Sequence, residues 1–186
     1  MTGWIILGIV VVVAIYAIVL YNRMVSLRQV VNQAWADISV QLKQRHDLVP
    51  NLVETVKGYA AHERGTFEAV TQARNAAVAA SSPDAQAKAE NVLTGALRQL
   101  FAVAEAYPDL KANQNFLQLQ SDLSDLENKI AAARRFFNNA VQEFNTAIQS
   151  FPMVVIAGPM GFTQRTFYDV DESERAAVNA APQVKF

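Results

Sequence analysis

The chain has 186 residues, of which 52% are hydrophobic and 18% charged, and its formal net charge is −1. This length suits a single domain, and a nearly neutral chain without a basic patch argues against binding to nucleic acid. The absence of cysteine excludes disulfides, thiolate zinc ligands and thiol nucleophiles. So apolar a composition requires a membrane segment or a large buried core.

Residues 4 to 21, WIILGIVVVVAIYAIVLY, form a run without a charged side chain. As a helix this run is roughly 27 Å long, close to the thickness of a bilayer's hydrocarbon core. A cleaved signal peptide is the alternative, but the basic n-region and the small-residue cleavage site are both missing. We therefore expect a transmembrane anchor over residues 1–22, which makes the lipid bilayer the first partner of this protein.

The charges beside the run predict its orientation. Arg23 and Arg28 follow the run, whereas only the α-amine precedes it. The positive-inside rule then places the N-terminus outside and the domain in the cytoplasm of a bacterial inner membrane. Because this rests on two arginines, a domain on the periplasmic or extracellular side stays open as the alternative.

Most of the chain after the anchor is predicted to be helical. Loops are indicated by SSPD (residues 81–84) and AYPDLKAN (residues 106–113), with Ser or Asp capping the helix after the first. The loops bound helices of about residues 85–105 and 114–149. The second helix carries a heptad seam typical of an antiparallel bundle or a coiled coil, while the first offers a shorter match that begins at Val92.

An apolar stripe also runs from Val31 to Val70 at helical spacing and stays in phase across Pro50. Two geometries fit this pattern. One is a continuous helix kinked at Pro50; the other is a tight turn at His46–Asp47 that begins a new helix with Pro50 in its first turn. The second is favoured here, because it yields four helices of similar length. The predicted fold is all-α, an antiparallel four-helix bundle with long helices over residues 23–150.

No arrangement of residues indicates catalysis or a cofactor. The two histidines, His46 and His62, lie on different faces of the expected helix, and no Glu-x-x-His motif accompanies them. A nucleophile elbow and a glycine-rich phosphate loop are also missing from the sequence. We therefore expect no enzymatic activity, no metal and no cofactor. A metal-dependent enzyme that uses His46 and Glu63 is the weaker alternative.

Several charged and aromatic residues are candidates for an interface or for setting helix register. Arg45, Glu63 and Arg74 fall near the centre of the apolar stripe, where a charge is costly unless it is paired. Snorkelling to the bundle edge would be the simpler explanation of these charges. Arg134 and Phe136 lie together on the long second helix, and Phe162 belongs to a Gly/Pro-containing tail over residues 151–186. This tail is too short and broken to form a second span, so it must pack on the bundle or on a neighbouring subunit.

Three blocks of the sequence resemble the bacterial LemA family. They are RHDLVPNLVETVKGYAAHERGTFEAVTQARN, NQNFLQLQSDLSDLENKIAAARRFFNNAVQEFNTAIQSFP, and the tail segments IAGPMGFTQRTFYDVDESERAA and PQVKF. The resemblance implies a membrane-anchored antiparallel four-helix bundle without known catalytic residues. Its pattern positions here are Asp47, Pro50, Asn51, Glu54, Tyr59, Glu63 and Arg74. Gly65 departs from a helix-favouring residue, which predicts a bend or a frayed end there.

Together these features favour a non-enzymatic, single-pass membrane protein that self-associates into a homo-oligomeric scaffold. A single anchor would hold all copies in one plane and raise their effective concentration. The alternative is a membrane-anchored adaptor or sensor that binds another membrane protein, such as a protease or transporter. The acidic segment DVDESER (residues 169–175) could pair with basic surface on another copy.

Overall fold

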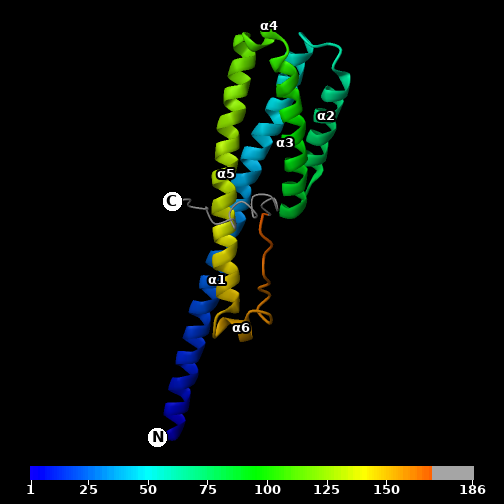
Figure 1. Cartoon of the computed structure of the whole chain (residues 1–186). Helices are drawn as coiled ribbons and strands as arrows, with labels where there is room; N and C mark the ends of the chain where they lie inside the picture. Colours follow the sequence, from blue (N-terminus) through cyan, green and yellow to red (C-terminus); the bar gives the residue numbers. More distant parts are fainter. Residues whose placement is uncertain (169–186) are drawn as a thin grey trace, which may run out of the picture. The chain divides into compact units, whose positions relative to one another are not determined.

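The computed structural model describes residues 1–168, and within that range every regular element is a helix, so the all-α prediction is confirmed. The acidic segment at residues 169–175 lies outside the described residues. Figure 1 shows the helices in chain order, and their bounds are α1 (Thr2–Lys57), α2 (Arg64–Ala79), α3 (Pro83–Glu105), α4 (Pro108–Lys111), α5 (Gln114–Gln149) and α6 (Met153–Ile156).

The residue contacts divide the chain into two compact units. The first, here called the paired-helix unit, consists of Met1–Val40 and Ala131–Thr166. The second, here called the bundle unit, consists of Gln41–Ile130 and the described residues Phe167 and Tyr168. The expected boundaries near residues 22 and 150 both fall within the paired-helix unit.

Four helical segments form the bundle unit: the end of α1, then α2, α3 and the first half of α5 (Figure 1). They pack around an apolar core because each carries an apolar stripe at helical spacing. Val56, Val70, Leu93 and Leu100 are fully buried in this core. The expected start of the α3 stripe was wrong by one residue, since Val92 is 62% exposed and its neighbour Leu93 is buried.

The favoured turn at His46–Asp47 is also wrong, because α1 continues through Pro50 and ends at Lys57. The apolar stripe stays buried on both sides of Pro50, and the proline ring itself is exposed. The stabilisation gained by burying one unbroken apolar stripe thus exceeds the cost of the backbone hydrogen bond that a proline removes. The chain turns instead between residues 58 and 63, after Gly58, and the four helices differ widely in length.

Side-chain caps define the starts of two helices. The Ser82 hydroxyl accepts a hydrogen bond from Ala85 N at 3.2 Å, and Pro83 occupies the first turn of α3. The Asn113 side chain accepts one from Phe116 N at 3.1 Å and begins α5. Both caps satisfy amide groups that have no partner within the helix. Gly65, where a bend or a frayed end was expected, lies in the first turn of α2.

In the paired-helix unit, α1 packs against the second half of α5. The rings of Trp35 and Phe137 are in contact, tilted at 54° with 5.5 Å between their centroids. Most of the predicted α5 seam is buried within the chain. The chain reverses after α6 at Gly161, whose φ of +75° favours glycine. Phe162 then returns to the helices and is 3% exposed, with its ring 5.6 Å from that of Tyr21.

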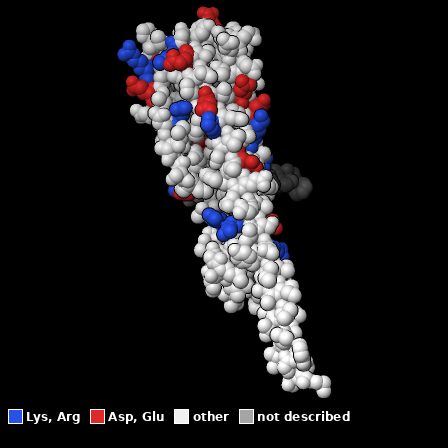
Figure 2. All heavy atoms as spheres, turned by 180° about the vertical axis from the view of Figure 1, so that it is seen from behind, with Lys and Arg blue, Asp and Glu red and all other residues white. Residues whose placement is uncertain are grey.

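The N-terminal part of α1 is apolar and leaves its side chains uncovered. Among residues 1–168 this is the one helix that is long and apolar enough to cross a membrane. Trp4 is 80% exposed and Val12 66% exposed. On the face shown in Figure 2 this part of α1 carries no charged side chain, whereas charges of both signs cover the bundle unit.

Candidate functional site

A buried ion pair joins α1 to α3 inside the bundle unit. Arg45 Nη1 donates to Glu90 Oε2 at 3.1 Å, with Arg45 2% exposed and Glu90 fully buried. The second terminal nitrogen of Arg45, Nη2, donates to Thr94 Oγ1 at 2.8 Å and to Glu127 Oε1 of α5 at 3.2 Å. One arginine side chain thereby contacts two other helices of the bundle.

Glu90 also accepts hydrogen bonds from two further side chains. His46 Nε2 lies 2.6 Å from Glu90 Oε1, and Gln86 Nε2 lies 3.1 Å from the same oxygen. Because an ionised carboxylate only accepts hydrogen bonds, Nε2 of His46 must carry a hydrogen. Gln86 Nε2 also donates to the carbonyl of Ala77 at 2.9 Å, near the end of α2. The polar cluster thus includes residues of all four helices: Arg45, His46, Gln86, Glu90, Thr94, Glu127 and the carbonyl of Ala77.

The cluster can keep a charge in the core because nearly all of its polar groups are paired. Glu90 receives three donors, and a buried carboxylate needs such partners to offset the loss of water. Arg45 Nε is an exception, since no described residue accepts its hydrogen bond. Glu90 has no accessible surface, so the arrangement is suited to fixing which residues of α1 and α3 face each other, rather than to contacting a solute.

A second polar contact replaces a backbone hydrogen bond that α1 lacks at Pro50. Proline has no N–H, so the carbonyl four residues earlier, that of His46, loses its helical donor. Arg74 of α2 supplies the missing hydrogen bond, with Nε 2.8 Å from His46 O. This contact links α1 to α2 at the position where α1 lacks a backbone hydrogen bond.

The neighbouring Asp47 is exposed and pairs with Lys43 one turn earlier on α1. Lys43 Nζ donates to Asp47 Oδ2 at 2.9 Å, and this hydrogen bond lowers the pKa of Asp47 below its ordinary value. The positive charges of Lys43 and Arg74 act in the same direction. An exposed pair of this kind contributes little to stability.

A groove of about 570 Å³ opens beside Pro50 between α1 and α2. Its apolar lining includes Val49, Val53 and Phe67, and charged side chains of both signs surround it. Arg74 lines this groove and also donates to the carbonyl of His46. An apolar floor with a charged rim suits a short amphipathic segment of another protein.

The structure separates the residues that the sequence singled out. Arg45 and Arg74 come together near His46, whereas Glu63 is partly buried at the N-cap of α2. In the paired-helix unit, Arg134 is partly buried and Phe136 is 51% exposed. Phe162 packs inside that unit, where Arg28 lies over its ring at 5.4 Å from the centroid. His62 is exposed, whereas His46 is buried.

Sequence reasoning missed the partners of Arg45. Gln86 and Glu90 precede Leu93 and Leu97 at helical spacing, so both lie on the buried stripe of α3. A glutamate on such a stripe could have been matched with the arginine on the stripe of α1. Among residues 1–168, no three His, Cys, Asp or Glu side chains are grouped so that they could hold a metal ion.

Comparisons with known proteins give one family match and two similar curated proteins. A model described as LemA family matches residues 34–186. Protein LemA of Metamycoplasma hominis is 29% identical over 121 residues, which cover 63% of this chain and 54% of that protein. Magnetosome protein MamQ of Magnetospirillum gryphiswaldense is 22% identical over 174 residues, covering 80% of this chain and 64% of that protein. The matches therefore span about half to two thirds of these relatives.

Proposed function

The chain belongs to the LemA family, and from this premise we propose that it is a non-enzymatic, membrane-anchored scaffold that self-associates through its helices. The apolar N-terminal part of α1 crosses the bilayer and confines every copy to one plane. Confinement raises the effective concentration of the copies, so a modest lateral contact is enough for assembly.

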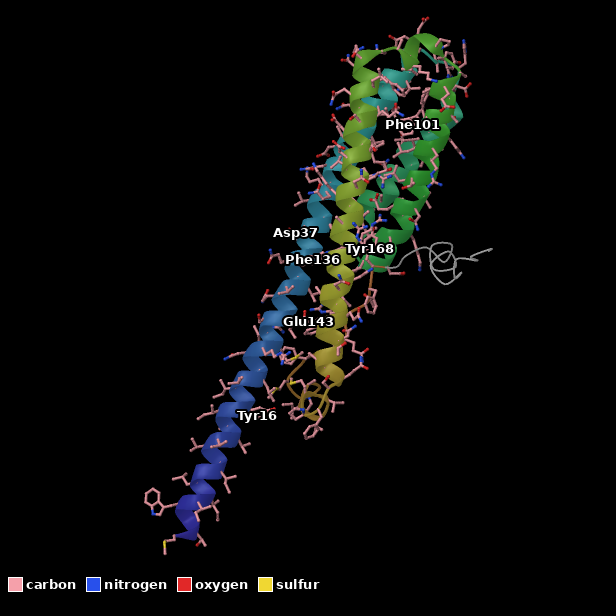
Figure 3. The ribbon with its side chains drawn as sticks, turned by 60° about the vertical axis from the view of Figure 1, so that its left-hand side comes forward. Tyr16, Asp37, Phe101, Phe136, Glu143 and Tyr168 are labelled. Atoms are coloured by element: carbon pink, nitrogen blue, oxygen red, sulfur yellow. The ribbon has the colours of Figure 1, made fainter. Side chains whose placement is uncertain are left out.

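The observation that carries self-association is an exposed aromatic side chain on α5. Phe136 is 51% exposed, its chain neighbour Arg135 is exposed on α5, and Asp37 is exposed on α1. Figure 3 shows Phe136 and Asp37 at a similar height, which agrees with the ring contact between Trp35 and Phe137. An aromatic ring with a charged rim is a common centre of a protein interface. The heptad seam of α5 is buried within the chain, so a second copy must use another face such as this one.

Phe136→Glu should convert regular multi-copy particles of the full-length protein into single copies. The substitution places a charge at the centre of the contact without disturbing the buried core. Single-particle imaging and mass measurement in mild detergent or nanodiscs would report the change. Leu117→Glu is the matched control, since Leu117 is also on α5 and 42% exposed. A wild-type protein that stays a single copy at every concentration would contradict the scaffold.

A groove beside Pro50 supports a second candidate function, that of an adaptor or sensor for another membrane protein. Its volume of about 570 Å³ and its apolar floor suit a helical or extended segment of a partner. Single-copy wild-type particles would favour this function, and a partner should then be recovered with wild type and lost when the groove is blocked at Thr71.

We further propose that the N-terminus lies outside and the bundle unit in the cytoplasm of the bacterial inner membrane. Arg23 and Arg28 follow the apolar segment and support this orientation. Because the chain has no cysteine, single cysteines can be introduced at Thr2 and Val92. In intact cells a membrane-impermeant maleimide should label position 2 and not position 92, and in lysed cells both. Labelling of position 92 alone in intact cells would establish the opposite orientation.

A further inference from the structure

The segment after α5 exposes large apolar side chains next to one another. Phe151 is 86% exposed, Val154 55% and Val155 67%. The sequence contains no Asp, Glu, Lys or Arg between Glu143 and Arg165. A water-facing loop of this composition is unusual, because exposed apolar groups of this size mark a contact surface.

This segment lies beside the end of the apolar part of α1, within the paired-helix unit. The rings of Tyr21 and Phe162 are 5.6 Å apart, and Tyr21 is the last residue of the apolar run. Leu20, Arg23 and Met24 of α1 also line a groove of about 490 Å³ together with residues 150–153. Two segments without charge, one before Arg23 and one after Glu143, thus meet where the apolar part of α1 ends.

The length of the apolar run fixes the depth of that meeting point. A run of roughly 27 Å matches the hydrocarbon thickness, so Leu20 and Tyr21 lie where α1 leaves the hydrocarbon. Tyrosine favours this depth, and an arginine just beyond it can reach the lipid phosphates. Phe151, Val154 and Val155 are therefore held at the level of the bilayer surface.

We propose that residues 150–156, which end with the short helix α6, insert into the bilayer surface as a second membrane contact beside the N-terminal helix. The partner is the lipid bilayer, because the exposed side chains continue the apolar surface of α1 and carry no charge. One contact comes from α1 and the other from the segment after α5. Together they restrict how this unit tilts against the membrane. This inference rests on the proposed transmembrane anchor.

Lipid quenching of a fluorescent label would test this contact in the full-length protein. Single cysteines at Phe151 and Val155 would each carry the label NBD, in nanodiscs that hold one copy in phosphatidylcholine and phosphatidylglycerol. Val12→Cys reports the anchor, and Val40→Cys is the exposed control on α1, about 28 Å beyond Tyr21 along the helix. Lipids spin-labelled near the headgroup should quench positions 151 and 155 at least twofold, deeply labelled lipids should quench position 12, and neither should quench position 40.

The outcomes separate this inference from the anchor on which it rests. Quenching at position 12 with none at 151 and 155 would overturn the second contact and keep the anchor. No quenching at position 12 would overturn both. If the labels at positions 151 and 155 become shielded from water only when two copies share one nanodisc, the segment is a contact between subunits. The proposed lipid contact is then overturned.

Discussion

Replacing Glu90 with leucine is expected to lower the free energy of unfolding of the full-length protein by about 3–5 kcal/mol. The carboxylate is fully buried and accepts hydrogen bonds from Arg45, His46 and Gln86. Removing it leaves the Arg45 charge without its buried partner, because Glu127 is half exposed and only partly compensates. Denaturant unfolding in mild detergent, followed by far-ultraviolet circular dichroism, would measure the loss.

Glu105→Leu is the matched control for this substitution. Glu105 lies on the same helix, α3, and is exposed, so its replacement should change stability by no more than about 0.5 kcal/mol. The double variant Arg45→Met with Glu90→Leu should regain much of the stability lost in Glu90→Leu alone, since it removes the unpaired charge. Equal losses in Glu90→Leu and Glu105→Leu would show that the cluster does not stabilise the bundle.

The polar cluster also explains why the bundle helices pack in one register. An apolar stripe made of similar valines and leucines can slide by one turn at little cost. A slide of α3 by one turn along α1 would separate Arg45 from Glu90 and bury both charges unpaired. We infer that the pair excludes such shifted packings, and the Glu90→Leu variant tests this through its loss of cooperativity as well as of stability.

Much of the fold was predictable because the pattern that defines it is local. The bounds of α5 follow from Asn113 as its cap and from the Gly/Pro segment after it, and the predicted range of 114–149 is confirmed. The buried stripe from Val31 to Val70 follows from spacing alone. Each of these features depends on residues within a few turns of one another.

The site was less predictable because its parts come from distant segments. Glu90 lies 45 residues from Arg45 in the sequence, and no local pattern indicates which acidic residue contacts which basic residue. The path of α1 through Pro50 depends in the same way on Arg74, whose guanidinium is supplied by a different helix. The sequence pattern fitted both a kinked helix and a turn at His46–Asp47, and the turn was favoured only because it gave four helices of similar length.

Replacing Arg74 with methionine is expected to destabilise the protein by about 1–3 kcal/mol, because it removes the donor to the carbonyl of His46. The loss should shrink when Pro50 is replaced by alanine. The amide of residue 50 then donates to the same carbonyl, as in any regular α-helix. A double-mutant cycle of Arg74→Met and Pro50→Ala, measured by denaturant unfolding, would give this coupling directly.

The size of the coupling distinguishes the role of Arg74 in the backbone from its charge. Arg64→Met removes an exposed arginine on the same helix and beside the same groove, so it should cost little in either background. If Arg74 acted mainly through its attraction to Asp47, its replacement would cost the same with proline or alanine at position 50. A coupling of about 1 kcal/mol or more would instead establish that α2 supplies the hydrogen bond that Pro50 removes from α1.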